Sequence, residues 1–436
     1  MLILLGFGNT NRAIAESFAP CIVLDDSFTT ESLDSLGNSL QPAQNLSKVL
    51  AQNPESLIIT SPGIPPHNAM ITTAREFVET HPKAKLLSEY DFFATILSKM
   101  PPSVWISGTN GKTTTTQMLT HLLQSFGVQS GGNIGTPLAK LNPNAPLWIL
   151  ETSSFTLHYT QIAKPILYLL LPLSQDHISW HSSYENYIED KLKPILFLRE
   201  KEIAILPKNL ESHPLCQQSL ANLIFYENSQ DLAEMFRLDL SKIAFKEPFL
   251  LDATLALSAC EILFSKQDYA LLNTFRIGAH KMEEFRDKEG NLWVDDSKGT
   301  NIDATMEAIK RYKDSTILLI LGGDDKGADL TPLFDLIAQC NVEIFAIGSN
   351  TDKLCALAKG IHSPCKACYT LEVAVRGIQE VFAKGAVASV ESKSYRDSKA
   401  KTPHYVALLS PAAASLDQFS SYKERGEKFK AYALKN

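Results

Sequence analysis

The stretch from Val104 to Gly127 places an apolar run, a glycine-containing loop and a long amphipathic segment in direct succession. Its loop reads Gly-Thr-Asn-Gly-Lys-Thr over residues 108–113, so only two residues separate the glycines. A strand that passes through such a loop into a helix is typical of parallel α/β sheets, where the loop and the helix N-terminus bind phosphate. A regular phosphate loop has four residues between its glycines, so a threonine-capped helix that binds nothing is the alternative interpretation.

Short apolar runs that end at turn residues alternate with helical stretches along the whole chain, which predicts an α/β fold. Because 436 residues exceed the size of one hydrophobic core, we expect two or three domains. The succession of strands and helices favours three, at residues 1–91, 92–277 and 278–436. Strands are predicted within residues 1–8, 21–26, 56–64, 104–107, 146–155, 166–174, 202–208, 292–297, 316–325, 343–349 and 405–411. The polar stretch 391–404 is predicted to be a surface loop.

Composition excludes several classes of protein. A formal charge of -7 gives no basic field for nucleic acid, and the N-terminus has neither a basic region nor an apolar run long enough for a signal or a membrane span. We therefore expect a cytoplasmic protein. Among seven cysteines only Cys365 and Cys368 form a C-x-x-C, which favours free thiols over a zinc site.

Polar residues follow two further predicted strands of the central domain. Glu151 closes one strand, where a carboxylate can reach a metal on nucleotide phosphates, and Asp176 with His177 follows another. Lys191 lies 14 residues after His177 in a helical stretch. Taken singly, Glu151 reads as a helix N-terminal charge and Lys191 as a surface lysine, so only their order along the chain favours a site.

Five motifs in this order resemble the Mur ligases, the ATP-dependent enzymes that add amino acids to the peptidoglycan stem peptide. They are G-T-N-G-K-T at residues 108–113, GGNIGTP at 131–137, LETSSF at 150–155, Asp176-His177, and DDSKGTN at 295–301. The ending LLSPAAASLDQFSSYKERGEKF, with SPGIPP and GGDDKGADLTPL, resembles the D-glutamate-adding branch. The resemblance implies a Rossmann-like UDP-binding domain, a central P-loop-type ATPase domain with a parallel-rich sheet, and a Rossmann-like C-terminal domain.

The resemblance also implies a reaction and the residues that carry it. ATP would activate the carboxylate of UDP-N-acetylmuramoyl-L-alanine as an acyl phosphate, which D-glutamate then attacks, in a protein we expect to be a monomer. Catalytic roles would fall to Lys112, His177, Lys191 and Lys298. Two Mg²⁺ ions would be held by Thr113, Glu151, His177 and a carbamylated Lys191. ATP would bind Gly108, Thr109, Asn110, Gly111, Lys112, Thr113, Thr114, Lys281 and Asp296.

Substrate positions follow from the same resemblance. UDP-N-acetylmuramoyl-L-alanine and D-glutamate would bind Asn9, Thr10, Ser61, Gly63, Asn133, Thr300, Lys326, Ser415, Leu416 and Tyr422, with Asp25 or Asp26 ending the second strand of the UDP domain. Three positions depart from the family, of which Tyr422, in place of a common phenylalanine, should be tolerated. Lys281 replaces an arginine expected at the γ-phosphate, and Asp252 replaces an asparagine that contacts adenine.

Three other interpretations stay open at this point. The chain could be another Mur-type amino-acid ligase or a folylpolyglutamate synthase, against which the C-terminal ending argues. It could be an NAD-dependent oxidoreductase that uses the N-terminal Gly-x-Gly, although Asn11 stands where that fingerprint needs its third glycine. It could also be a noncatalytic nucleotide-binding scaffold, which does not explain why Glu151, His177 and Lys191 follow in order.

Overall fold

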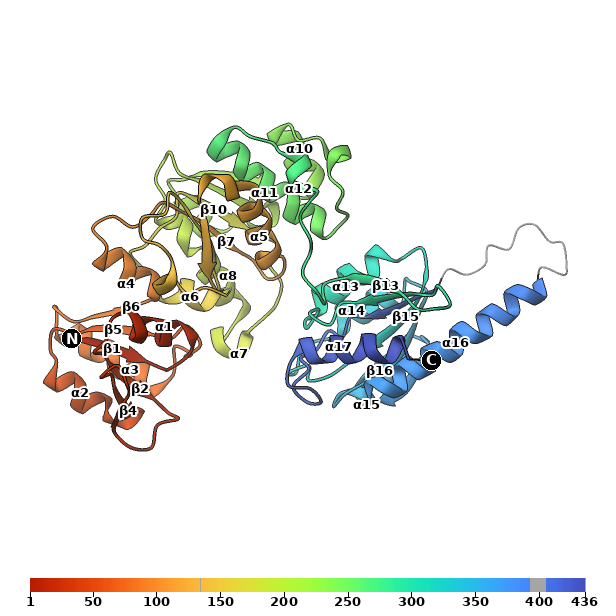
Figure 1. Ribbon diagram of the computed structural model, residues 1–436, viewed down its shortest axis with the longest axis horizontal. Helices are drawn as coiled ribbons and strands as arrows, with labels where there is room; N and C mark the ends of the chain where they lie inside the picture. The colour runs from red at the N-terminus through yellow and green to blue at the C-terminus, as the bar shows by residue number, and fades with distance from the viewer. Residues whose placement is uncertain (134, 393–404, 436) are drawn as a thin grey trace. The chain divides into compact units, whose positions relative to one another are not determined.

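The computed structural model describes residues 1–133, 135–392 and 405–435. The chain forms three sheets of six strands each, and almost all neighbouring strands run parallel (Figure 1). Contacts divide it into two compact units, Met1–Phe275 with the first two sheets and Arg276–Asn436 with the third. The predicted α/β fold with three mostly parallel sheets is confirmed.

The first sheet has the strand order β3-β4-β2-β1-β5-β6, and only the β3–β4 pair is antiparallel. Its strands are β1 Leu2–Leu5, β2 Ile22–Asp25, β3 Ser32–Leu33, β4 Ser39–Pro42, β5 Leu57–Thr60 and β6 Lys85–Leu87. Its helices are α1 Asn9–Ser17, α2 Leu46–Gln52 and α3 Ala69–Thr80, and α4 Glu89–Ile96 leads on to the second sheet.

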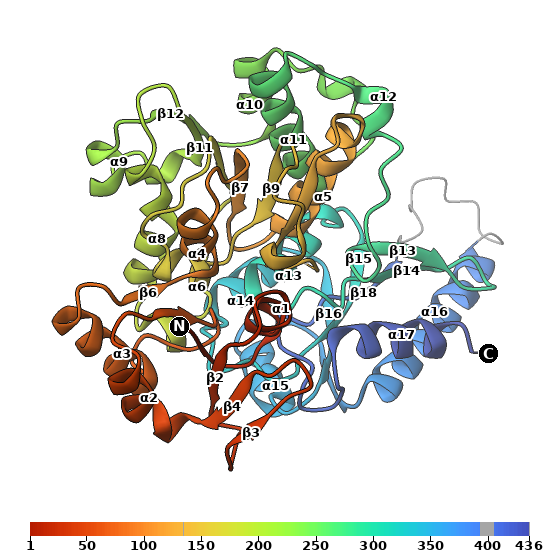
Figure 2. The same cartoon turned by 60° about the vertical axis from the view of Figure 1, so that its left-hand side comes forward.

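The second sheet is parallel throughout, in the order β12-β11-β10-β7-β9-β8 (Figure 2). Its strands are β7 Ser103–Ser107, β8 Gln129–Gly132, β9 Trp148–Glu151, β10 Leu167–Leu170, β11 Ile203–Pro207 and β12 Asn222–Tyr226. The helices are α5 Lys112–Leu123, α6 Ser154–Tyr159, α7 Ile178–His181, α8 Tyr184–Leu192, α9 Pro214–Gln218, α10 Ser229–Phe236, α11 Phe249–Phe264 and α12 Tyr269–Leu272. Because β7, β9 and β10 are buried on both faces, they read as continuous apolar runs.

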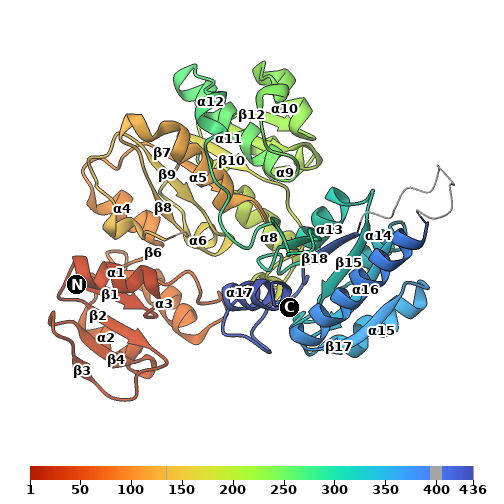
Figure 3. The same cartoon turned by 45° about the vertical axis from the view of Figure 1, so that its right-hand side comes forward.

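The third sheet has the order β13-β14-β18-β15-β16-β17, with one antiparallel pair, β13–β14. Its strands β15, β17 and β18 are labelled in Figure 3. Its strands are β13 Glu283–Arg286, β14 Leu292–Asp295, β15 Thr316–Leu321, β16 Val342–Ile347, β17 Cys365–Tyr369 and β18 Tyr405–Leu409. Its helices are α13 Ile302–Arg311, α14 Thr331–Ile337, α15 Thr351–Gly360, α16 Leu371–Ser392 and α17 Tyr422–Ala433. Leu318 and Ile320 face the core under α16 and α17, so Ile317 and Leu319 face the opposite side of the sheet.

Several sequence-based expectations need a note. Strands β3, β4, β6, β8, β12, β13 and β17 were not predicted. Helix α16 continues through residues 391–392, so the predicted loop is wrong there, and residues 393–404 of it lie outside the described part of the chain. The boundary predicted after residue 91 lies inside α4, and the three domain limits stay a prediction.

The cysteines and the helices bear on two further expectations. All seven cysteines are free thiols, and Cys365 Sγ lies 3.0 Å from Cys355 Sγ, on the neighbouring helix α15. Within the described residues, no helix combines the length and the apolar content that a bilayer crossing requires.

Candidate active site

Between β7 and α5 the chain makes a tight loop that only glycine permits at two positions. Gly108 has a φ of 141° and Gly111 a φ of 84°. A Cβ on Gly108 would lie 2.5 Å from the Cβ of Leu171, and one on Gly111 would lie 2.4 Å from Asp252 Oδ1. The loop therefore packs its backbone directly against Leu171, which follows β10, and against α11, and α5 begins at Lys112 with its N-terminus at the loop.

Parallel pairing explains which side chains meet this loop. In the register, Ile106 pairs with Glu151 and Glu151 with Gly132, so the ends of β7, β9 and β8 are adjacent. Thr113, on the first turn of α5, donates its hydroxyl to Glu151 Oε2 at 2.8 Å. Asn133 Nδ2 donates to the other carboxylate oxygen, Oε1, at 2.8 Å. Three residues predicted from separate motifs thus meet at one carboxylate that is 3% exposed.

The Thr113 hydroxyl and the Glu151 carboxylate are hard oxygen donors, which is the chemistry that Mg²⁺ requires. They lie at the N-terminus of α5, where a phosphate would bind. The two residues therefore fit a magnesium ion bound to nucleotide phosphate.

Lys112 and Lys191 approach the loop from different helices and reach the same atom. Lys112 Nζ donates to the carbonyl oxygens of Gly108 and Thr109 at 2.9 and 2.7 Å, and Lys191 Nζ donates to Gly108 O at 2.9 Å. Lys191 is 1% exposed. Burial and then the charge of Lys112 hold the pKa of Lys191 well below its usual range. The amine of Lys191 therefore loses its proton more readily than the amine of an exposed lysine does.

His177 lies at the N-terminus of α7 in a left-handed conformation, with a φ of 54°. The centroid of its ring lies 4.7 Å from the ring centroid of Phe155, and its backbone N–H donates to Asp176 Oδ1 at 2.9 Å. Burial lowers the pKa of His177; Asp176 opposes this, and the charges of Lys112 and Lys191 add to the lowering. A neutral imidazole can act as a metal ligand, so the side chain suits its predicted role.

The remaining loop residues differ in environment. Thr109 is buried, and its hydroxyl lies 2.8 Å from Tyr187 Oη, whereas Asn110 is exposed and Thr114 is buried in α5. Asp252, the departure on α11, is 3% exposed and accepts the hydroxyl of Thr115 at 2.8 Å. The carboxylate therefore belongs to the packing between α5 and α11, next to Gly111.

The residues predicted to bind uridine diphosphate gather at the carboxyl ends of β1, β2 and β5 in the first sheet. Asn9 and Thr10 open α1, and the loop of Ser61 and Gly63 lies against them, since a Cβ on Gly8 would be 3.1 Å from Ser61 Oγ. Asp25, the last residue of β2, accepts the Phe7 N–H at 2.7 Å, whereas Asp26 is exposed and lies beyond the strand.

Asn11 explains why the glycine of a dinucleotide fingerprint is not needed here. Its buried side chain donates to the carbonyl oxygens of Leu5 and Gly6 at 2.9 Å each. The amide therefore holds the turn between β1 and α1.

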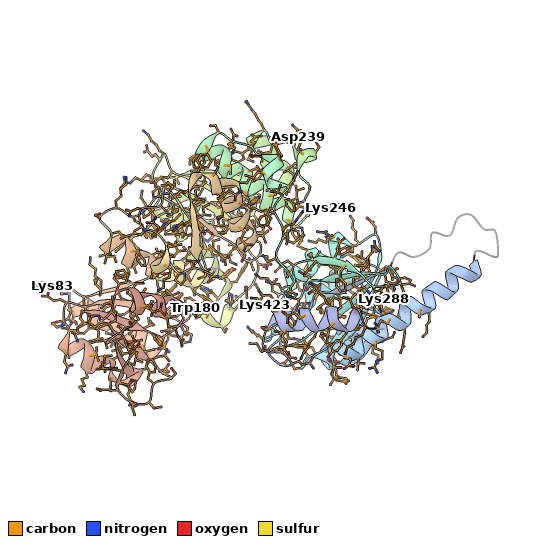
Figure 4. The ribbon with its side chains drawn as sticks, in the orientation of Figure 1. Lys83, Trp180, Asp239, Lys246, Lys288 and Lys423 are labelled. Carbon is orange, nitrogen blue, oxygen red and sulfur yellow. The ribbon has the colours of Figure 1, made fainter. Side chains whose placement is uncertain are left out.

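The loop of Ser61 and Gly63 is joined by hydrogen bonds to the helices that follow Glu151 and His177, which are α6 and α7. Trp180, on α7 and labelled in Figure 4, donates its Nε1 proton to Gly63 O at 3.3 Å. Tyr159 Oη, at the end of α6, donates to Ile64 O at 2.7 Å.

In the second unit, predicted residues follow β14. Asp296 is 7% exposed and accepts Ser410 Oγ at 2.7 Å and the Met282 N–H at 3.2 Å. Burial raises the pKa of Asp296 to about 7, although the hydrogen bond from Ser410 opposes it. Lys298 donates its backbone N–H to His280 O at 3.1 Å, which brings it beside the turn that contains Lys281.

Lys281 and Thr300 lie in these two turns. Lys281 stands between two residues with positive φ, 63° at His280 and 50° at Met282. Thr300 is exposed, two residues after Lys298, and donates its N–H to the Lys298 carbonyl at 2.8 Å.

The residues predicted for D-glutamate come from two paired loops. Asp324 and Ala414 form an antiparallel bridge, which brings the loop of Lys326 alongside the loop of Ser415 and Leu416. Lys326 is exposed with a φ of 49°, Leu416 is 69% exposed, and Ser415 is buried. Tyr422 opens α17, and its ring centroid is 5.7 Å from Lys298 Nζ.

One buried residue that sequence reasoning missed ties these loops together. Arg425, 1% exposed, donates to Ser297 Oγ at 3.0 Å, to Ser297 O at 2.9 Å and to Ala413 O at 3.2 Å. It therefore fixes the loops after β14 and β18 against α17. The sequence carries one indication of this role, because Arg425 lies four residues before Phe429 and so on the buried face of α17. Lys430 Nζ, also on α17, lies 2.6 Å from Glu283 Oε2, so an ammonium occupies the His280, Glu283 and Asp295 cluster.

Comparison with known proteins agrees with this geometry. The family profile of the Mur ligase middle domain matches residues 106–249, which contain the loop, Glu151, His177 and Lys191. The structure of MurF from Acinetobacter baumannii superposes with a TM-score of 0.58 at 14% identity, covering 99% of this chain and 93% of that one. The fold and the matched middle domain are those of the Mur ligases.

Relatives that match over nearly their full length show which branch of the Mur ligases this chain belongs to. A protein of Campylobacter jejuni subsp. jejuni named UDP-N-acetylmuramoylalanine--D-glutamate ligase is 48% identical over 431 residues, covering 98% of this chain and 98% of the relative. One of Helicobacter pylori with the same name is 44% identical over 450 residues, covering 99% of each. The chain belongs to the UDP-N-acetylmuramoylalanine--D-glutamate ligase family, and the predicted family and enzyme class are confirmed.

Proposed function

We propose that this chain joins D-glutamate to UDP-N-acetylmuramoyl-L-alanine at the expense of ATP, giving ADP and phosphate. The observation that carries the proposal is the convergence of Lys112, Lys191 and Glu151 at the loop between β7 and α5. Such a cluster places cations and hard oxygen donors where phosphates of ATP would bind, and phosphoryl transfer depends on this kind of clamp more than on a protein nucleophile. We also propose that the protein acts in the cytoplasm and that it is a monomer.

The loop residues and the start of α5 would bind the phosphates of ATP. Backbone N–H groups of the loop and the start of α5 would donate to phosphate oxygens, except that of Thr109, which donates to Pro172 O at 3.2 Å. Lys112 would exchange its bonds to the loop carbonyls for the β- and γ-phosphates. Lys281 and Asp296 would add nucleotide contacts. When bound, Mg²⁺ would neutralise phosphate charge, held by Thr113 and Glu151 at one site and by His177 and modified Lys191 at a second.

The environment of Lys191 supports the proposed carbamylation of its side chain. The neutral amine would attack CO2, forming a nitrogen–carbon bond and losing one proton, which leaves a carbamate anion. The low pKa of the buried amine favours this reaction, since only the unprotonated nitrogen is nucleophilic. The carbamate anion would also attract the ammonium group of Lys112, which the unmodified amine does not.

The amide would form in two steps. The alanyl carboxylate of the substrate would attack the γ-phosphorus of ATP, releasing ADP and forming an acyl phosphate. The amine of D-glutamate would then attack the acyl carbon, and phosphate would leave with loss of a proton from nitrogen. Lys298 would stabilise charge on the acyl phosphate, and Thr300 would orient the incoming amino acid.

Binding of the two substrates would use the remaining predicted residues. Asn9, Thr10, Ser61 and Gly63 would bind the uridine diphosphate at the N-terminus of α1, where the N–H groups suit a phosphate. Asn133, held by Glu151, would contact the muramoyl side. Lys326 with Ser415, Leu416 and Tyr422 would bind D-glutamate, whose two carboxylates require a cation and hydrogen-bond donors.

Phosphate release by the purified protein tests this function. We expect release from ATP only when UDP-N-acetylmuramoyl-L-alanine and D-glutamate are both present, and no release with L-glutamate, L-lysine or diaminopimelate. Turnover with L-lysine or diaminopimelate instead would indicate another Mur-type ligase, and turnover with a folate and L-glutamate would indicate a folylpolyglutamate synthase. Either result would contradict the assignment of Lys326 and Ser415.

A further inference from the structure

A buried chain of hydrogen bonds runs through three helices beside the metal candidates. His181 Nδ1, at the end of α7, lies 2.8 Å from Asp190 Oδ2 of α8, and His181 Nε2 lies 2.9 Å from Ser154 Oγ, the first residue of α6. A carboxylate only accepts, so Nδ1 carries a proton, and Nε2 accepts from the serine hydroxyl when the ring is neutral. The side chain of His181 is 0% exposed.

This order of serine, histidine and aspartate is that of a hydrolytic triad, but the serine cannot act as a nucleophile here. Ser154 is 3% exposed, and its hydroxyl is enclosed between α6 and His181. A nucleophile needs a substrate within reach of its oxygen. The chain of hydrogen bonds therefore serves to hold helices in place.

Each member of the chain is close in sequence to one proposed metal ligand. Ser154 follows Glu151 by three residues, His181 follows His177 by four, and Asp190 directly precedes Lys191. The hydrogen bonds therefore connect the three segments that carry these ligands, without using the ligands themselves.

Helix α7 depends on such side-chain contacts for its position. It has four residues, with left-handed residues before and after it, His177 at a φ of 54° and Ser182 at 71°. A helix of this length makes too few backbone hydrogen bonds to be stable alone. His181 also stacks on Phe155, with ring centroids 5.6 Å apart.

We propose that His181 is a positioning residue that fixes the turn of His177 relative to Glu151 and Lys191, with Asp190 and Ser154 as its two anchors. The inference rests on the proposed function, because it assumes that these three residues hold metal. Removal of His181 would leave the ligands intact but would let the His177 turn move, which weakens metal binding.

The chain offers a matched control for this test. His158 Nδ1, on α6, also contacts Asp190, at 2.9 Å from Oδ1, and its Nε2 lies 3.3 Å from Arg75 Nη2 on α3. His158→Phe and His181→Phe therefore each remove one histidine from the same carboxylate while keeping an aromatic ring. Only His181→Phe removes a hydrogen bond to α7, whereas the phenyl ring of His158→Phe can keep the contact that His158 makes with Trp180, at 5.2 Å between ring centroids.

The measurement is Mn²⁺ binding by electron paramagnetic resonance in the presence of the imido analogue of ATP, together with the melting temperature of each ligand-free protein. We expect His181→Phe to weaken Mn²⁺ binding at least about tenfold and Ser154→Ala to weaken it about threefold or more. His158→Phe should stay within about twofold of the unsubstituted protein. A merely structural role would lower the melting temperature of His181→Phe without changing the Mn²⁺ affinity.

The outcomes separate this inference from the function it rests on. Lack of Mn²⁺ binding by the unsubstituted protein would overturn the proposed metal site and the inference with it. Unchanged affinity in His181→Phe, or an equal loss in His158→Phe, would overturn the inference alone. If circular dichroism shows His181→Phe to be unfolded, Ser154→Ala decides, and unchanged Mn²⁺ affinity in that variant would overturn the role of His181.

Discussion

Lys112 and Lys191 each bring a side-chain nitrogen within 2.9 Å of one acceptor, the carbonyl oxygen of Gly108. Two ammonium groups so placed repel each other, and Lys191 is buried as well, so its neutral amine is favoured. Under the proposed function, Lys191 is therefore the residue of the pair that CO2 would modify.

Lys191→Ala should lower kcat by at least about 100-fold, because the carbamate would supply charge at the reacting phosphates. Acetate or bicarbonate should raise the kcat of this variant roughly tenfold, because either anion can enter the space that the side chain leaves. The check is steady-state turnover with and without these additives. Lys193→Ala is the control, since Lys193 donates to His158 O and not to the loop. Indifference of the Lys191→Ala rate to both anions would count against the carbamate.

Glu151→Gln should raise the Mg²⁺ concentration needed for half-maximal rate at least about tenfold. The amide still fits between Thr113 and Asn133, but it loses the negative charge that attracts the metal. A titration of turnover against Mg²⁺ measures the change. Glu202→Gln, which removes a charge paired with Lys164 elsewhere in the unit, should leave the Mg²⁺ requirement unaltered. Equal requirements in all three proteins would remove Glu151 from the metal site.

Lys326→Met should raise KM for D-glutamate about ten- to 100-fold, the effect of losing one charged hydrogen bond worth about 1.5–3 kcal/mol. KM for ATP should stay within about twofold, because the side chain would contact only the amino acid. Lys359→Met, on the exposed surface of α15, provides the control. A parallel rise in both KM values would show that Lys326 acts on the nucleotide or on the fold.

Asp296→Asn should change how stability depends on pH. The pKa of Asp296 in the folded protein is raised by burial to about 7, from an ordinary value near 3.8. The folded state therefore holds this proton more tightly than the unfolded state does, and its contribution to stability is lost as pH rises from about 4 to about 7. The melting temperature of the asparagine variant, relative to the unsubstituted protein, should increase across that window and level off above it.

The exposed Asp314→Asn is the comparison for this measurement, and its melting temperature should follow the unsubstituted protein at every pH. A constant difference between Asp296→Asn and the unsubstituted protein from pH 4 to pH 8 would show that the carboxyl group does not titrate in this range.

Much of the fold could be predicted from the sequence because the central strands are buried on both faces. Strands β7 and β10 read as continuous apolar runs, and the polar residues after them mark the strand ends. By contrast, β8 has the sequence Gln-Ser-Gly-Gly, which has no apolar pattern, and is a strand only because it pairs with β9. Tertiary pairing overrides local preference in such edge strands.

The candidate site could be predicted in part for a similar reason. Lys112 and Thr113 open the helix that follows β7, Glu151 ends the neighbouring parallel strand β9, and motif order along the chain identifies them. The contact of His181 with Asp190 depends on the angle between α7 and α8, which a left-handed residue at each end of α7 determines. No spacing rule encodes that angle, so this contact could not be predicted.

The central claim is that the substrate carboxylate takes the phosphoryl group of ATP. Its most direct test uses UDP-N-acetylmuramoyl-L-alanine labelled with ¹⁸O in the alanyl carboxylate, with ATP and D-glutamate, followed by mass spectrometry of the phosphate released. The account predicts one ¹⁸O atom in each phosphate and a product heavier by one glutamyl residue. Phosphate without the label, released as fast as the amide forms, would contradict it.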